Sequence, residues 1–276
     1  MPRLPLPQVT LCAVDTQAPA LTMRSLLRST AGIDFARVLL FTHKWLPTRV
    51  VPGVEIIDIG PLPTPADRSQ FLLRQLLAHI RSSHVLITQW DGFVADPGAW
   101  SDEFLVHDCI APVWPDAPAG RQVGSGGFSL RSRRYLAAGT DRRITQLHPE
   151  DRALGATYRE QLERVHGVSF APPALARRFA WGDETASATA FGFHGAQHLP
   201  RVLNAVTMAQ WLPLLPLAFY DQPAALGLAR MLMARGMPLL AQHVLQRCQS
   251  AGHTGLQLRV LGAAAALLNA LKPARA

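Results

Sequence analysis

The chain has 276 residues, enough for one large domain or for one domain with a small appendage. Hydrophobic residues make up 49% and charged residues 17% of it, a balance that excludes disorder as the general state. The net charge of +8 favours anionic partners, but none of the common nucleic-acid-binding modules is visible, so we expect no nucleic-acid partner.

The cysteines and the first residues bear on the compartment. Cys12, Cys109 and Cys248 are widely spaced, and none has the paired spacing of a zinc or redox site. The first seven residues lack the apolar core of a secretory signal, and no apolar run approaches the roughly 20 residues needed to span a bilayer. We therefore expect a cytoplasmic protein, with a place at the inner face of the membrane as a further option.

The first 90 residues alternate between strand and helix signals. Short apolar runs predict strands at Val9–Val14, Arg37–Thr42, Val54–Ile59 and His84–Thr88. Amphipathic stretches predict helices at Leu21–Thr30 and Asp67–Arg81. This alternation indicates an α/β fold, a mostly parallel Rossmann-like sheet flanked by helices. Ligands bind beyond the carboxyl ends of such strands, which makes Asp15-Thr16, Thr42-His43 and Gln89–Gly92 candidate positions.

The middle of the chain is less regular, as is common where a substrate site is built above a sheet. The pattern there predicts a glycine-rich strand, a helix and two short pieces, at Val123–Leu130, Glu150–Val165, Val168–Ala171 and Thr189–Phe193.

Strand signals stop near residue 200, where we expect the boundary between domains 1–200 and 201–276. Three helices are predicted beyond it, at Ala224–Arg235, Met237–Ser250 and Gly255–Leu271. Their spacing of small and apolar residues resembles a tetratricopeptide hairpin, and an ordinary helical cap explains it as well. So short a repeat cannot bury a core alone, so 224–271 should pack on the main domain, on a protein partner or on a second copy.

Three segments carry chemistry-bearing residues, and each also has a structural explanation. Asp91 follows a buried strand, where a carboxylate meets a ligand or a divalent cation, but an Asp-Gly pair is also ordinary turn chemistry. Glu150 and Asp151 begin a helix, where acids either complement the dipole or accept a hydroxyl proton. His194 lies among small residues and, with Asp91, would make a site suited to Mn²⁺, although most lone histidines are packed or at the surface.

The segment 123–134 combines glycine with three arginines, so that a ligand can approach the main chain near cations. A kinked strand followed by a basic helix start explains the same pattern. It is not a Walker loop, because no Gly-Lys-Ser/Thr follows.

Taken in order, five segments resemble a largely uncharacterised glycosyltransferase family of the GT-A structural class, found in bacteria and some eukaryotes. They are Gln89-Trp90-Asp91-Gly92, Asp108 to Trp114, Gly126 to Ser132, Pro149-Glu150-Asp151 and Phe191-Gly192-Phe193-His194. The similarity covers roughly residues 8 to 200. It implies a GT-A-like fold and transfer of a hexose-like sugar from a nucleotide diphosphate donor to a hydroxyl acceptor, in glycan or glycoconjugate synthesis.

The resemblance also implies roles for individual residues. Asp91 and His194 would hold Mn²⁺ or Mg²⁺ against the leaving diphosphate, although Gln89 replaces the first aspartate of the usual Asp-x-Asp motif. Asp151, or else Glu150, would be the base for the acceptor hydroxyl. The nucleotide and donor would contact Asp15, Thr16, Arg68, Gln89 and Trp90. The donor and acceptor pocket would be shaped by Trp114, Gly126, Gly127 and Phe128.

A second hypothesis is a catalytically inactive binding or scaffold protein that keeps the GT-A-like frame and recruits protein partners through its helical tail. Departures from the family pattern at Ser125 and at Ala180-Trp181-Gly182 are compatible with altered specificity or lost activity. Peripheral membrane contact through the basic surface and the stretch Met208–Tyr220 is compatible with either hypothesis.

Overall fold

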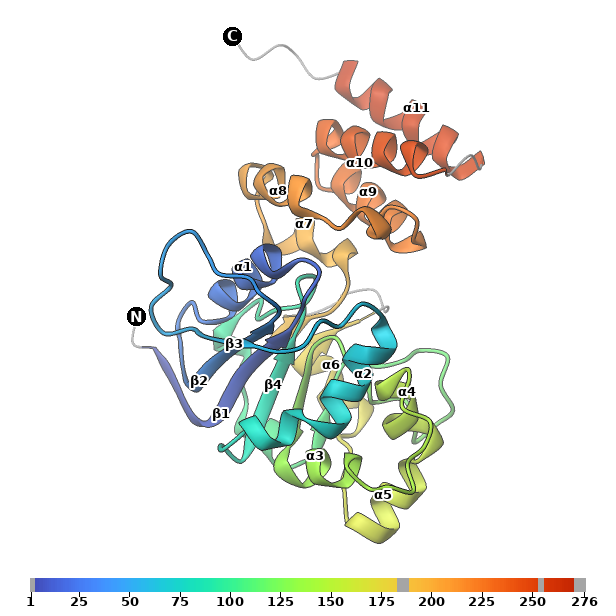
Figure 1. The fold of residues 1–276 in the computed structure, drawn as a ribbon. Helices are drawn as coiled ribbons and strands as arrows, with labels where there is room; N and C mark the ends of the chain where they lie inside the picture. Colours follow the sequence, from blue (N-terminus) through green and yellow to red (C-terminus); the bar gives the residue numbers. More distant parts are fainter. Residues whose placement is uncertain (1–2, 183–188, 253–255, 271–276) are drawn as a thin grey trace. The chain divides into compact units, whose positions relative to one another are not determined.

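The computed structural model describes residues 3–182, 189–252 and 256–270. The chain divides into two units, Met1–His194 and Gly195–Ala276, and each is described by itself (Figure 1). The division falls shortly before residue 200, where the composition changes. Within the described ranges, no helix is long and apolar enough to cross a membrane.

Unit 1 is built on a six-stranded sheet with the strand order β3-β2-β1-β4-β6-β5. The strands are β1 (Leu4–Val14), β2 (Ile33–Thr42), β3 (Glu55–Asp58), β4 (His84–Thr88), β5 (Cys109–Ile110) and β6 (Ser129–Ser132). Strands β3, β2, β1 and β4 pair in parallel, whereas β6 is antiparallel to both β4 and β5. This confirms the predicted α/β fold with a mostly parallel sheet. A separate parallel pair joins β7 (Ala180–Trp181) to β8 (Gly192–Phe193).

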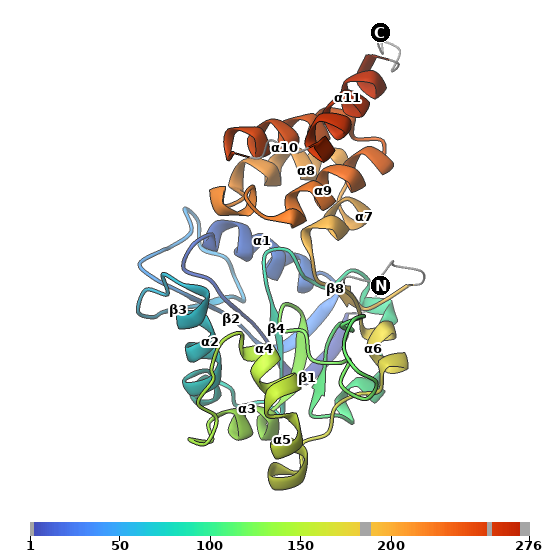
Figure 2. The ribbon, with the colours of Figure 1, turned by 90° about the vertical axis from the view of Figure 1, so that its right-hand side faces the viewer.

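Helices cover both faces of the sheet (Figure 2). Leu11 and Ala13 of β1 belong to the core beneath α1 (Pro19–Ser29) and α6 (Pro173–Phe179). The alternate residues Cys12 and Val14 belong to the opposite core, beneath α2 (Pro65–Arg74) and α3 (Arg133–Gly139). Because successive side chains point to opposite faces and both faces are covered, the second half of β1, Leu11–Val14, is apolar on both faces.

Helix α2 begins at a capping box. The Thr64 hydroxyl accepts a hydrogen bond from the Asp67 N–H, and the Asp67 carboxylate accepts one from the Thr64 N–H. The start fixed in this way puts Arg68 in the first turn, where its Nε donates to the carbonyl of Val14 at the end of β1. The helix ends at Arg74, earlier than predicted, and a 3-10 helix at Leu76–His79 follows it.

Two predicted elements of the middle region were wrong in part. Only β6 forms a strand within the predicted Val123–Leu130, because glycines at 124, 126 and 127 pack closely on other segments and form no ladder. The predicted helix Glu150–Val165 is divided into α4 (Glu150–Arg152), a π-helical turn (Ala153–Thr157) and α5 (Arg159–His166). Gly155 lies in that turn, against the ring of Trp114.

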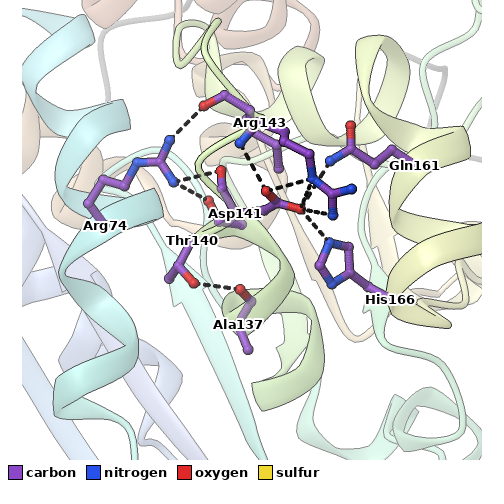
Figure 3. Close-up of polar contacts among 9 residues, drawn as sticks. Arg74, Ala137, Thr140, Asp141, Arg143, Gln161 and His166 are labelled. Atoms are coloured by element: carbon purple, nitrogen blue, oxygen red, sulfur yellow. Dashed lines mark hydrogen bonds and ion pairs between the residues drawn. The ribbon is translucent and has the colours of Figure 1, made fainter.

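A polar network ties α2, α3 and α5 together (Figure 3). The carboxylate of Asp141, just after α3, accepts hydrogen bonds from Arg143, Gln161 and His166. Arg74 of α2 donates to three main-chain oxygens in residues 139–144. Hydrogen bonds from Arg143, with a further one from His166, hold the pKa of Asp141 well below its usual range.

Unit 2 is helical, and the three predicted C-terminal helices are confirmed over the described residues; Gly255 and Leu271, the predicted ends of the last one, lie outside them. Its helices are α7 (Leu199–Val202), α8 (Ala205–Trp211), α9 (Pro223–Ala234), α10 (Pro238–Ser250) and α11 (Leu256–Ala270). Short 3-10 helices at Ala196–His198, Leu212–Leu214 and Leu217–Phe219 lie among them. In Met208–Tyr220, most apolar side chains are buried and Leu217 is exposed. The predicted membrane contact therefore depends on Leu217 and on the basic surface.

Candidate functional site

Distant segments of unit 1 meet where β4 ends. The turn Gln89–Gly92 is closed by reciprocal main-chain hydrogen bonds of 3.3 and 3.2 Å between its end residues. A Cβ on Gly92 would lie 2.8 Å from the carbonyl oxygen of Phe193 and 3.3 Å from that of Gly127. This close approach requires glycine, and it brings Asp91 next to the residues that follow β8.

Asp91 and His194 come together at this point. The Oδ1 atom of Asp91 lies 3.7 Å from Nε2 of His194. Oδ1 is buried, and it has no hydrogen-bond partner among the described residues. Leaving a buried acceptor without a partner costs about 1–3 kcal/mol, so an orphaned carboxylate oxygen beside an imidazole nitrogen is a feature that a ligand explains.

The donor set fits a divalent cation that is shared with a ligand. Carboxylate oxygen and imidazole nitrogen both suit Mn²⁺, and diphosphate oxygens and water complete the coordination of such ions in many sites. Within the described ranges, no group of three or more His, Cys, Asp or Glu side chains is arranged to hold a metal. The pair Asp91 and His194 would therefore hold a cation only in an open site.

Gly127 supports the imidazole ring of His194. A Cβ at this position would lie 2.0 Å from Nε2 and 2.3 Å from Cε1 of the ring. Any larger residue would have to displace the ring. Gly127 thus acts on the site by fixing where His194 lies.

The neighbouring glycine fixes Asp151. The N–H of Gly126 donates to Oδ2 of Asp151 at 3.1 Å, and the N–H of Arg152 donates to Oδ1 at 2.8 Å. Asp151 is partly buried. Gly126 thus contacts Asp151 and the next residue, Gly127, contacts His194, so one short loop touches both side chains.

Glu150 is held in the core instead. It is 3% exposed, and its Oε1 lies 3.0 Å from Nη2 of Arg131, which is 1% exposed. Arg131 Nε also donates to the Ser129 hydroxyl. Of the two adjacent acids, Asp151 is the more accessible to an acceptor. Arg131 was considered only as one of the three arginines of segment 123–134, and its pairing with Glu150 was not predicted from the sequence.

Arg68 approaches the turn from α2. Its Nε donates to the carbonyl of Val14 at 3.1 Å. With the amide of Gln89 oriented to suit its hydrogen-bonding neighbours, the Gln89 oxygen accepts from Nη2 at 3.1 Å and from Nη1 at 3.2 Å. The structure thus brings together Arg68 and Gln89, two residues expected to contact the donor.

Three other residues expected to contact the nucleotide have structural contacts here. Both carboxylate oxygens of Asp15 accept hydrogen bonds at the start of α1, from the main chain and from Thr22. The Thr16 hydroxyl bonds the main chain of Leu62. The carbonyl of Trp90 accepts from the hydroxyl of Ser25. These contacts hold in place the segments that follow β1 and β4 at their carboxyl ends.

The two aromatic residues expected to shape the donor and acceptor pocket are both buried. Trp114 is 5% exposed, and the guanidinium of Arg152 lies 4.1 Å above its ring. Gly124 and Gly155 pack against the same ring, where a Cβ would meet it at 2.8 and 2.9 Å. Phe128 is fully buried against Phe179 and Phe191, so it belongs to the core below the site.

Comparison with known proteins places this region in a family. The family described as "Protein of unknown function (DUF5672)" matches residues 55–194, about half of the chain. The match includes Arg68, the turn at 89–92, both glycines of the loop, Asp151 and His194. No curated protein matches the chain.

Proposed function

The chain belongs to the family described as a protein of unknown function (DUF5672), and we propose that it is a nucleotide-sugar-dependent glycosyltransferase with a GT-A-like fold. It would move a sugar from a nucleotide diphosphate donor to a hydroxyl acceptor, in glycan or glycoconjugate synthesis. The order of the motifs supports this proposal. The observation that supports it best is that one loop, Gly126-Gly127, contacts both Asp151 and His194, and that His194 lies beside Asp91.

Asp91 and His194 are proposed for the donor. They would hold Mn²⁺ or Mg²⁺, which neutralises negative charge on the leaving diphosphate. The orphaned Oδ1 of Asp91 supports this role, because a cation or a ligand donor would satisfy it. Gly127 keeps the His194 ring in place for the same purpose.

Asp151 is proposed for the acceptor. Its carboxylate takes the proton of the acceptor hydroxyl as that oxygen attacks the anomeric carbon. The bond from this carbon to the phosphate oxygen breaks, the nucleoside diphosphate leaves, and the configuration inverts. The Gly126 N–H orients the carboxylate, and Glu150 stays paired with Arg131.

Substitution of the two carboxylates tests the proposal. We expect Asp91→Ala and Asp151→Asn each to slow release of the nucleoside diphosphate from a nucleotide sugar by roughly 100-fold or more, the usual contribution of a general base or metal ligand. The control is Glu160→Gln, which removes an exposed carboxylate from α5. Circular dichroism and thermal unfolding check that each variant folds. Full activity in both site variants would show that the site is assigned to the wrong residues.

One observation favours the second candidate, an inactive binding or scaffold protein. Both oxygens of Asp151 accept main-chain hydrogen bonds, as those of a purely structural carboxylate do. In that case the partners would be proteins, bound through residues 224–271, or a second copy of the chain. Asp151→Asn would then lower stability, and the wild type would bind no nucleotide sugar.

A further inference from the structure

Three charged side chains, Arg68, Arg131 and Glu150, form one cluster on α2, β6 and α4. Arg131 and Glu150 are buried and paired directly. The charge of the same glutamate is the strongest favourable one acting on Arg68. The charge of one carboxylate therefore acts on two guanidinium groups.

Arg68 itself is held by neutral oxygens. Its hydrogen bonds go to the carbonyl of Val14 and to the side-chain oxygen of Gln89. Among the residues that the structure describes, no carboxylate forms an ion pair with it. Burial lowers the pKa of Arg68, which is the effect expected for a cation that lacks a direct counter-ion.

Neighbouring groups do not remove this excess of positive charge. Arg74, further along α2, also donates to main-chain oxygens. Its partners lie at and after the end of α3, where the negative end of the helix dipole compensates the charge of Arg74. Asp15 is the second carboxylate whose charge acts on Arg68. Its own oxygens already accept hydrogen bonds at the positive end of α1.

We propose that Arg68 binds a phosphoryl group of the donor diphosphate directly, so that donor binding does not depend entirely on a metal ion. A guanidinium has five N–H groups; Val14 and Gln89 accept three of those of Arg68, which leaves two to donate to phosphate oxygens. The identity of the donor rests on the proposed function. The anion site itself rests on the hydrogen bonds of Arg68 to neutral oxygens and on the charges around it.

The turn at 89–92 explains why the anion is a diphosphate. Gln89, the contact of Arg68, begins the turn, and Asp91 lies two residues further on, beside His194. A diphosphate bound to Arg68 has a second phosphoryl group that could lie near that pair, whereas a single phosphate has none. Glutamine at position 89 also fits this role, because its neutral oxygen contacts Arg68, whereas a glutamate of the same shape would pair with Arg68 and neutralise it.

The test is calorimetric titration of the full chain with inorganic pyrophosphate in EDTA. The wild type should bind, and Arg68→Met should bind at least tenfold more weakly. Gln89→Glu, which keeps the shape of the side chain, should weaken binding to a similar degree because it supplies Arg68 with a counter-ion. Glu150→Gln should tighten binding severalfold by removing the shared carboxylate. Arg28→Met, which removes an exposed positive charge from the last turn of α1, is the matched control and should bind like the wild type.

Several results would overturn the assignment. One is unchanged affinity in Arg68→Met, and another is a wild type that binds pyrophosphate only after Mn²⁺ is added. If Arg68→Met does not fold, the opposite shifts in pyrophosphate affinity expected for Gln89→Glu and Glu150→Gln test the assignment, and affinity unchanged in both overturns it. Orthophosphate that binds as tightly as pyrophosphate would exclude a diphosphate site. If pyrophosphate binds as described but no nucleotide sugar is turned over, the anion site stands and the glycosyltransferase proposal fails.

Discussion

At the scale of single residues, two adjacent glycines determine how the candidate site is arranged. Gly126 donates its N–H to Asp151, and Gly127 packs beneath His194. Neither glycine has a positive φ, so the requirement comes from close approach of neighbouring groups. The sequence suggested that a ligand approaches this loop. The structure shows that side chains of the protein itself, Asp151 and His194, contact this loop.

Replacement of Gly127 by alanine tests this role. The added Cβ would lie within about 2 Å of the imidazole, so the ring of His194 must move. We expect Gly127→Ala to weaken Mn²⁺ binding, measured in the presence of a nucleoside diphosphate, by roughly 10–100-fold, as is usual when the support of a metal ligand is lost. Gly60→Ala is the control, because a Cβ on Gly60 meets no atom within 4 Å. Equal Mn²⁺ affinity in the two variants would contradict the role given to Gly127.

At the scale of elements, the sequence predicted best where each strand is covered on both faces. The apolar runs within β1, β2 and β4 exist because helices pack on both sides of the sheet. Their pattern was therefore enough to predict these three strands. The loop 123–128 was mistaken for a strand, because close packing of its glycines on distant segments leaves no trace in local pattern. The pairing of Arg131 with Glu150 was not predicted, because the two residues are far apart in sequence and no local pattern joins them.

The capping box of α2 gives a prediction for one element. Thr64→Ala removes the hydroxyl that accepts the N–H of Asp67 and should lower the free energy of unfolding by about 1 kcal/mol. Because Arg68 lies in the same turn, pyrophosphate affinity should fall as well. Thr64→Ser keeps the acceptor and should restore both. Urea unfolding and calorimetry measure the two effects, and a serine variant that behaves like alanine would exclude the cap as their cause.

The Asp141 network gives a pH dependence. Its hydrogen bonds hold the pKa of this carboxyl below the ordinary value of about 3.9, so its contribution to stability is present above that pH and is lost as the pH falls through the folded-state pKa. We expect Asp141→Asn to be less stable than the wild type at pH 7 and to lose less on acidification below pH 4. Urea unfolding at pH 7, 4 and 3 measures this, and parallel pH curves for the two proteins would contradict it.

At the scale of the whole molecule, every residue proposed to bind or react lies in unit 1, between Asp15 and His194. Unit 2 has helices that resemble a repeat hairpin, and its proposed role is to contact a partner. A chain shortened after Leu203 should therefore keep pyrophosphate affinity within about threefold of the full chain. A larger loss in a folded fragment would show that the helical unit contributes to binding.

The central claim is that this site binds a nucleotide sugar through Asp91 and its neighbours. Calorimetry of the wild type with UDP-, GDP- and CDP-sugars in Mn²⁺ tests it most directly, with Asp91→Asn and Glu160→Gln titrated alongside. We predict that at least one nucleotide sugar binds the wild type and Glu160→Gln equally, and binds Asp91→Asn at least tenfold more weakly. Absence of binding by the folded wild type to every member of the panel would contradict the claim.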